Sequence, residues 1–273
     1  KRHRVILIGI RNDHKVLPEI LQKHKEKINL KSIIGDLPKI RSGIHRKIAK
    51  SSKNKKKYEI IRNTNENWLM IIKNYQEELL LSLSFFKRKF RPVQNKNGLG
   101  NEYIRYKTPS LFNPLFDWYN DKNLVGVIHH KSRSHLNTDL KRYMFSTIYA
   151  KHHNRFPRLK DYYKYDRNLI PNHKNASSGK FADRFRVQLP LEVATTITSH
   201  ISKDGHYFIH YDEKQCRSLT VREAARIQTF PDNYFFSGPR TAQFHQVGNA
   251  VPPLLANQIA KIVSNLFNDI INH

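Results

Sequence analysis

The sequence has only one cysteine, Cys216, among 273 residues, and it has no long apolar run. A single cysteine excludes an internal disulfide framework and a zinc site built from several cysteines, and it fits a reducing, cytoplasmic setting. No stretch approaches about eighteen consecutive apolar residues, so we expect no membrane-spanning helix. Lys1 is not preceded by methionine and no signal segment follows it, which leads us to expect a cut inside a longer gene product or a trimmed chain.

Acidic residues are scarce as well. The chain has 22 Asp and Glu against 49 Lys and Arg, which gives a formal net charge of +27. A field of this sign attracts polyanions, and counterion release at phosphates supplies most of the binding free energy. An AT-rich genome that favours lysine codons would explain the same composition. The charge favours a nucleic-acid partner over that alternative.

Local patterns predict elements in the first third of the chain. The run Val5–Ile10 is apolar without alternation, which predicts a strand buried on both faces. Residues 15–29 predict an amphipathic helix, and residues 67–86 predict a longer helix with one apolar face in the core. Between these helices, the basic residues 41–65 predict either a solvated loop or a phosphate-contacting arm.

The middle of the chain, residues 90–189, has no clean periodicity. Its many aromatic side chains could stack on bases, but such residues more often line a core, and we favour the core. Its histidines raise the question of a metal site, and the members concerned are His129, His130, His135, His152 and His153. No HExxH pattern or cysteine partner accompanies them, so we predict no bound metal.

Two motifs near the carboxyl end predict well-defined helix starts. Thr220 followed by Glu223 is a capping box, and the helix it begins must end before Pro231. Further on, Gly248 and Asn249 predict a tight turn at positive φ, followed by a helix with proline at its first position. The apolar stripe from Leu255 to Ile270 predicts a helix that docks on the rest of the protein. The turn before it either serves only to start this helix or carries a function, because backbone amides point outward at a helix N-terminus.

These motifs resemble those of a known family. The segment Arg217–Asp232 resembles the ninth sequence block of bacterial DNA cytosine-5 methyltransferases, and Gln246–Ile259 resembles the tenth. Arg2 and Arg4, ahead of the apolar run, resemble the arginine pair of the eighth block. Residues 195–198 resemble the threonine segment of the target-recognition domain, and all four segments follow one another in the family's order.

The resemblance implies an α/β fold in two parts. One part is the C-terminal remainder of a methyltransferase Rossmann-like domain, with one core strand and a C-terminal helix. The other is a mixed α+β target-recognition domain. Residues 1–40 would end the catalytic domain, residues 41–200 would form the recognition domain with its basic loop, and residues 201–273 would hold the ninth and tenth blocks and the closing helix.

The chemistry of that family needs residues that are not evident here. Such enzymes add a cysteine thiolate to C6 of a flipped-out cytosine and take a methyl group from S-adenosyl-L-methionine. Their nucleophile follows a proline, whereas Cys216 follows Gln215, so we interpret Cys216 as a structural thiol. We therefore expect the chain to be inactive alone. We expect its partners to be double-stranded DNA and a missing N-terminal portion or subunit, which would bind most of the cofactor.

The resemblance also assigns roles to single positions. Arg4 would approach the flipped cytosine and Arg2 would support it. Gly248, Asn249 and Ala250 would line the cofactor pocket. Thr196 would lie near the DNA backbone, while three further residues of the ninth block would organise the fold: Arg222, Glu223 and Arg226. The bases read are not encoded in any pattern, and candidate DNA contacts in the middle region are Arg133, Arg142, Arg155, Arg158, Arg184 and Arg186.

Two functions remain open at this point. The first is a portion of a cytosine-5 methyltransferase that recognises a specific DNA sequence and completes methylation, in a restriction–modification system. The second is a non-catalytic specificity subunit or a gene remnant that binds DNA only. A general basic DNA- or RNA-binding protein would explain the charge but not the two C-terminal blocks.

Overall fold

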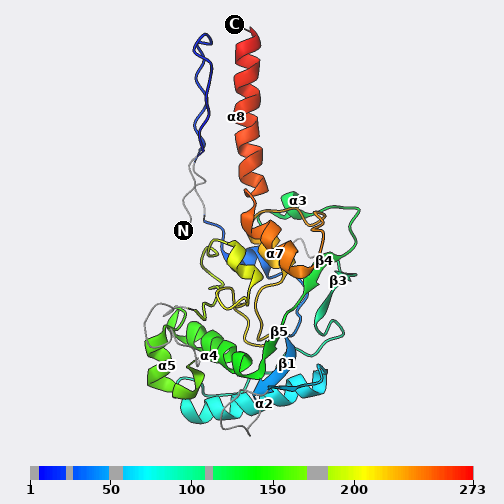
Figure 1. The fold of residues 1–273 in the computed structure, drawn as a ribbon, viewed down its shortest axis with the longest axis vertical. Coiled ribbons are helices and arrows are strands. Elements are labelled where there is room, and N and C mark those ends of the chain that lie inside the picture. The colour runs from blue at the N-terminus through cyan, green and yellow to red at the C-terminus, as the bar shows by residue number, and fades with distance from the viewer. Residues whose placement is uncertain (1–5, 23–26, 49–57, 108–112, 171–183, 273) are drawn as a thin grey trace.

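The computed structural model describes residues 6–22, 27–48, 58–107, 113–170 and 184–272. These ranges contain eight α-helices, five strands and two short 3-10 helices (Figure 1). In chain order they are α1 (Leu30–Ile34), β1 (Gly43–Ile48), β2 (Tyr58–Ile60), α2 (Asn65–Ser82), β3 (Gly100–Ile104), α3 (Phe116–Tyr119), β4 (Val127–Lys131), β5 (Ser134–Leu136), α4 (Asn137–His153), α5 (Leu159–Tyr165), η1 (Arg167–Leu169), η2 (Ser199–Ser202), α6 (Val221–Ile227), α7 (Arg240–Asn249) and α8 (Pro253–Asn272).

The strands form two small sheets. In the first, the order is β2-β1-β5, with β1 antiparallel to β2 and parallel to β5. The second is the antiparallel pair β3-β4. The expected mixed α/β class is confirmed at this level. The predicted loop at residues 41–65 is wrong at residues 43–48 and 58–60, which form the paired strands β1 and β2. The lysines at positions 50, 53 and 55–57 lie outside the described residues.

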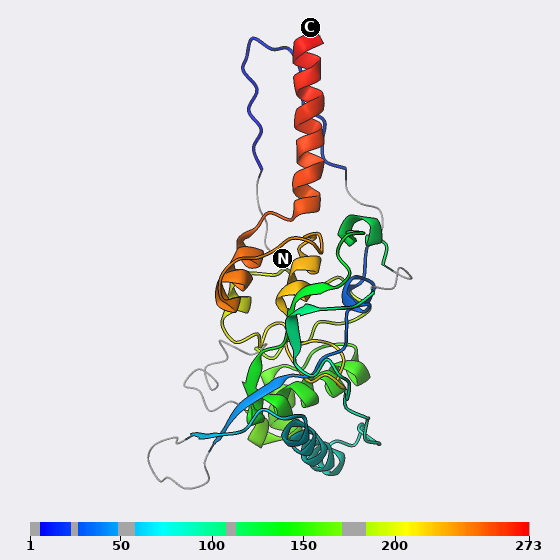
Figure 2. The ribbon, with the colours of Figure 1, turned by 90° about the vertical axis from the view of Figure 1, so that its right-hand side faces the viewer.

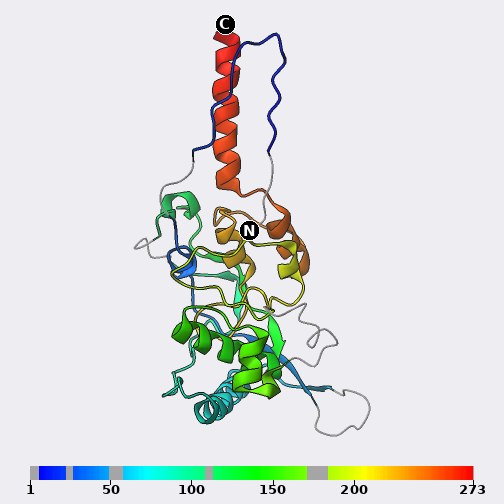
Figure 3. The same ribbon diagram turned by 90° about the vertical axis from the view of Figure 1, so that its left-hand side faces the viewer.

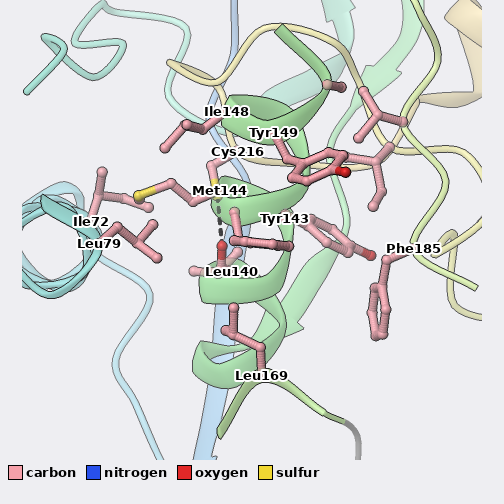
Figure 4. Packing of buried hydrophobic residues seen from close by; sticks show 14 of the residues in the cluster. Ile72, Leu79, Leu140, Tyr143, Met144, Ile148, Tyr149, Leu169, Phe185 and Cys216 are labelled. Carbon is pink, nitrogen blue, oxygen red and sulfur yellow. Dashed lines mark hydrogen bonds between the residues drawn. The ribbon is translucent and has the colours of Figure 1, made fainter. Parts of the chain in front are cut away.

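The first core lies between α2 and α4 (Figure 4). Helix α2 begins where the Thr64 side chain accepts a hydrogen bond from the backbone of Asn67, and its apolar face buries Ile72 and Leu79 completely. The helix predicted at residues 67–86 is therefore present, but it runs from Asn65 to Ser82 and ends four residues earlier than predicted. Tyr143 of α4 is also fully buried, as expected for the middle-region aromatics.

The second core joins α1, α6, α7 and β4. Ile34, Val127, Ala224 and Phe244 meet there, each at most 2% exposed. Both cores draw residues from more than one of the three predicted segments. The boundaries near residues 40 and 200 stay predictions.

Helix α8 projects from the rest of the molecule, and the segment 6–22 runs beside it (Figures 1, 2 and 3). Proline occupies its first position as predicted, and the hydroxyl of Thr229 accepts a hydrogen bond from Leu254 in its first turn. Ile262 and Leu266 are buried on the predicted stripe, while Phe267 is 60% exposed. No helix within the described ranges is long and apolar enough to cross a membrane.

Two predictions for this segment are wrong in the structure. Residues 6–10 form no strand, and Leu7 is 89% exposed. A strand buried on both faces needs a neighbour on each side, and no strand of the described chain pairs with it. The described part of 15–29 is not helical either, because Leu17 and Ile20 find no core to cover them and a short amphipathic helix is not stable without one.

Candidate nucleic-acid interface

Helix α6 is a seven-residue helix whose charged side chains are buried. Its capping box is present as predicted, with Thr220 and Glu223 bonding each other's backbone amides. The Arg217 guanidinium donates to both carboxylate oxygens of Glu223, at 2.6 and 2.7 Å. Burial opposes the ionisation of Glu223, but Arg217 outweighs it, so the pKa of that carboxyl lies well below its usual value.

The other two arginines of α6 connect distant segments. Arg226 donates to both oxygens of Asp232, at 2.8 and 2.6 Å, and to Asp36 at 2.6 Å. Arg222 donates to the backbone carbonyls of Ile128, Pro231 and Tyr234 and lies 3.9 Å from the carboxylate of Asp232. Burial lowers its pKa to about 10. All three predicted organising residues are at most 1% exposed. They are buried among other segments of the protein and hold these segments together.

The segment of residues 195–199 is held in place by hydrogen bonds and by packing on the second core. Both the backbone amide and the hydroxyl of Thr195 donate to the side-chain oxygen of Gln188, at 3.1 and 2.9 Å. Ile197 is 1% exposed in the second core, so the segment is fixed on both sides of Thr196. Thr196 itself is exposed. Its side chain is therefore presented to solvent from a rigid backbone.

Gly248 packs against the backbone of the same segment, at Thr198 and Ser199. It lies within α7 and not at positive φ, so the predicted tight turn at Gly248 and Asn249 is wrong. A Cβ at position 248 would lie 2.5 Å from the backbone nitrogen of Ser199 and 2.6 Å from the carbonyl carbon of Thr198. The glycine is required because α7 and η2 approach each other here, not because the chain turns.

Exposed Thr196 lies at a hollow of about 730 Å³. Its polar lining consists of Arg186, Thr195, Thr196, Thr198, Ser199, His200 and Tyr207. Hydroxyl groups, an imidazole and a guanidinium are the groups that proteins place against phosphate oxygens and base edges. The hollow therefore brings two of the predicted DNA contacts, Thr196 and Arg186, into one site.

The remaining candidate arginines lie outside this hollow. Arg155 pairs with Asp161 at 2.9 Å, and Arg158 is exposed. The Arg133 guanidinium caps η2 by donating to the carbonyls of residues 201–203, and burial lowers its pKa to about 10. Arg142 donates to the carbonyl of Leu169 and to Asp139, at 2.7 and 2.8 Å. Arg184 pairs with Asp204 at 2.8 Å but keeps a partly exposed side chain. Arg133 and Arg142 therefore serve the fold, while DNA contact by Arg186 and Arg184 stays a prediction.

The predicted cofactor residues differ in their surroundings. Gly248 is buried against η2, Ala250 packs on the second core, and Asn249 is exposed at the end of α7. Asn249 alone of the three offers an exposed polar side chain, and their role in a cofactor site stays a prediction. The predicted catalytic residues Arg2 and Arg4 lie outside the described residues.

The single cysteine is a structural thiol, as its sequence context predicted. Cys216 is fully buried, burial raises the pKa of its thiol, and its sulfur lies 3.2 Å from the carbonyl oxygen of Leu140 (Figure 4). The buried histidines also serve the fold. His130 bonds the Thr220 hydroxyl and the carbonyl of Pro38, and no cluster suited to a metal ion occurs in the part of the chain that the structure describes.

Two glutamines that support the interface were not found from the sequence. Gln188 holds Thr195, and Gln228 donates to the carbonyl oxygen of Val247 at 3.1 Å, beside the contact with η2. Neither belongs to a local repeat or a capping pattern. The one available signal was that Gln228 ends the ninth-block helix as a polar residue before a buried phenylalanine.

Comparisons with known proteins show the family to which the chain belongs. A sequence model of C-5 cytosine-specific DNA methylases matches residues 1–265. Type II methyltransferase M.Bpa9945I of Bacillus paralicheniformis is 60% identical over 99 residues, which cover 36% of this chain and 22% of that protein. Type II methyltransferase M1.HphI of Haemophilus parahaemolyticus is 43% identical over 98 residues, 36% of this chain and 24% of that protein.

A shorter relative is covered more fully. Type II methyltransferase M.AquIB of Picosynechococcus sp. is 42% identical over 103 residues, 34% of this chain and 70% of that protein. For the first two relatives, by contrast, the match spans less than a quarter of the length. With the family match extending over nearly the whole sequence, the chain belongs to the C-5 cytosine-specific DNA methylases.

Proposed function

We propose that this chain is the DNA-recognising portion of a DNA cytosine-5 methyltransferase of a type II restriction–modification system. It selects a DNA sequence and, once joined to the portion that carries the catalytic cysteine, completes the methylation of cytosine at C5. The family membership and the type II relatives support this assignment. The hollow around Thr196 supplies the surface for DNA.

One observation carries the proposal. Gly248 of the tenth block packs directly on the backbone of Thr198 and Ser199, so the block that borders the cofactor in this family is in contact with the segment that borders the DNA. A shift of one moves the other, because the contact is between backbones with no room for adjustment. This contact couples recognition to the position of the cofactor edge.

The chemistry is shared between this chain and its complement. S-adenosyl-L-methionine supplies the methyl group, and this chain contributes Asn249 and Ala250 to one edge of the cofactor site. Arg4 approaches the flipped cytosine and Arg2 supports it. Cys216 is not the nucleophile, because a buried thiol whose pKa is raised forms no thiolate near neutral pH. The chain alone is therefore inactive.

The complementary portion docks on exposed apolar side chains. Ile6, Leu7 and Ile8 of the N-terminal segment and Phe267 and Ile271 of α8 are each more than 40% exposed. A patch of this kind marks an interaction site. In the completed enzyme these residues pack against a Rossmann-like catalytic domain, and the complement is either part of the same polypeptide or a separate subunit.

A second function is favoured by one observation, the inert cysteine. A chain without a usable thiolate can serve as a specificity subunit or remnant that binds DNA and transfers no methyl group. The two functions differ in whether a supplied catalytic portion restores turnover.

The test is a labelled-methyl assay with duplex DNA, run with the chain alone and with a catalytic portion taken from a type II relative. We expect incorporation only in the combined reaction. The Arg4→Ala variant should abolish incorporation while leaving DNA affinity nearly unchanged. DNA binding without incorporation in the combined reaction would instead establish the specificity subunit, and a loss of binding in Arg4→Ala would contradict its catalytic role.

A second arm tests the hollow. Thr196→Ala should weaken binding of the target sequence, whereas Thr241→Ala, an equally exposed threonine on α7, should not. Equal affinities for both variants would remove Thr196 from the interface.

A further inference from the structure

A second hollow, of about 790 Å³, lies in the other half of the molecule. It is formed by the loop after α2, the C-terminal half of α4 and a short turn near residue 213. We call it the basic hollow and define it by the residues that line it: Phe85, Phe86, Lys87, Arg88, Lys89, Phe90, Arg91, Ile148, Lys151, His152, Glu213 and Lys214. None of the sequence motifs points to this site.

The basic hollow concentrates positive charge. Six lysines and arginines line it against one carboxylate, that of Glu213. Lys89 pairs with Glu77 and Lys151 pairs with Glu213, both at 2.7 Å. The other four cations have no acidic partner among the residues the structure describes, and they are Lys87, Arg88, Arg91 and Lys214. The end of α4 adds a partial negative charge, which Lys151 in its last turn offsets.

The loop that carries these cations has a fixed backbone. The amide of Phe90 donates to the side chain of Gln76 at 2.7 Å, and Gln76 is 1% exposed. Three residues later, the amide of Val93 donates to the carbonyl of Lys214 at 2.9 Å. The first bond anchors the loop on α2, and the second joins it to the turn that carries Lys214, unlike a solvated run of charge on a mobile loop.

Aromatic rings form the floor. Phe86 is 9% exposed and belongs to the first core, and Phe85 stacks on His152 with ring centres 5.0 Å apart. Phe85 also contacts Tyr165 edge-on, at 5.3 Å. An apolar floor excludes water beneath the cations and so strengthens their attraction for an anion above it.

We propose that the basic hollow binds the phosphate backbone of DNA, as a second contact outside the hollow around Thr196. This inference rests on the proposed function, since it takes DNA as the partner. Duplex DNA carries one negative charge per 1.7 Å of its axis, a density that matches four unpaired cations held close together. Contacts of this kind add affinity and fix the orientation of the protein, and they read no sequence.

The experiment compares two triple variants of the full chain. Lys87→Ala, Arg88→Ala and Arg91→Ala remove three charges from the basic hollow. The control, Arg105→Ala, Lys107→Ala and Lys122→Ala, removes three exposed charges that lie near β3 and α3. Affinity for two duplexes of unrelated sequence is measured by fluorescence anisotropy at several salt concentrations, after circular dichroism has established that both variants are folded.

We expect the slope of log affinity against log salt to shrink by up to about 2.7 in the first variant, since each phosphate contact contributes about 0.9. The loss should be equal for both duplexes and much smaller in the control. If the first variant keeps the wild-type slope, or matches the control, the inference is overturned while the proposed function stands. If the wild-type chain shows no salt-dependent affinity for DNA, both fail. A variant that loses affinity for polyglutamate but not for DNA overturns the inference in favour of an acidic protein partner.

Discussion

Gly248→Ala tests the contact on which the proposed coupling rests. The substitution adds one methyl group at a position where α7 crosses the backbone of η2. That methyl group would lie 2.5 Å from the nitrogen and 2.7 Å from the Cα of Ser199, and 2.6 Å from the carbonyl carbon of Thr198. All three atoms belong to the backbone, so no side chain can rotate to make room.

Two effects of opposite sign decide the outcome. Alanine is better than glycine inside a helix by about 0.8–1 kcal/mol, which alone would stabilise the protein. Overpacking a tight contact costs about 1–3 kcal/mol, and this contact is with backbone, so the cost lies toward the upper end. We expect a net loss of about 1–2 kcal/mol in the free energy of unfolding, which for a chain of this size lowers Tm by about 2–8 °C.

The measurement is thermal and urea unfolding of the wild type, Gly248→Ala and the control Thr241→Ala. Thr241 is exposed on the same helix, so its replacement gains propensity without a clash. DNA affinity should fall in Gly248→Ala and not in the control, because the displaced backbone carries Thr196. A Gly248→Ala variant that is as stable as the wild type, with unchanged DNA affinity, would refute the reasoning.

Three further predictions concern buried groups. Glu223→Gln leaves the Arg217 guanidinium buried without its counter-charge, so urea unfolding should register a loss of about 3–5 kcal/mol, and a loss below about 1 kcal/mol would contradict the pairing. Burial lowers the pKa of His130 from 6.5 to about 4, so the unfolded chain takes up the proton first. Stability should fall as pH drops from 6.5 toward 4, by up to about 3 kcal/mol from this group, and His130→Gln should remove that part of the pH dependence. Cys216 should resist alkylation by iodoacetamide until the chain unfolds, and Cys216→Ala should leave methyl transfer intact in the completed enzyme; rapid labelling of the folded protein would contradict its burial.

Elements that are specified by neighbours in the sequence were predictable. The starts of α6 and α8 were predicted from a capping box and from a proline at the first position, whereas the start of α2, capped by Thr64, was predicted two residues late. Each signal acts over three or four residues, because a cap stabilises a helix through hydrogen bonds within its first turn. An organising role for the charged side chains of α6 was implied by the family resemblance and not by these local signals.

What depends on distant segments could not be predicted. Whether residues 6–10 form a strand is decided by the presence of neighbouring strands, and the apolar run alone does not supply them. Gly248 was expected to serve a turn, but its reason is a backbone some fifty positions earlier. Charge in the sequence likewise did not distinguish Arg133 and Arg142, which turn inward to carbonyls and carboxylates, from Arg186 at the hollow.

The pairing of α8 with the segment 6–22 has a consequence for how the protein is made. Asn265 of α8 donates to Glu19 at 3.2 Å across 246 positions of sequence. On the ribosome, the early segment emerges long before the helix that lies beside it, so their contact can form only after the intervening chain has been translated. Contacts that close so large a loop form slowly. Yield in the cell should therefore depend on translation speed and on chaperones that hold the early segment until α8 is released.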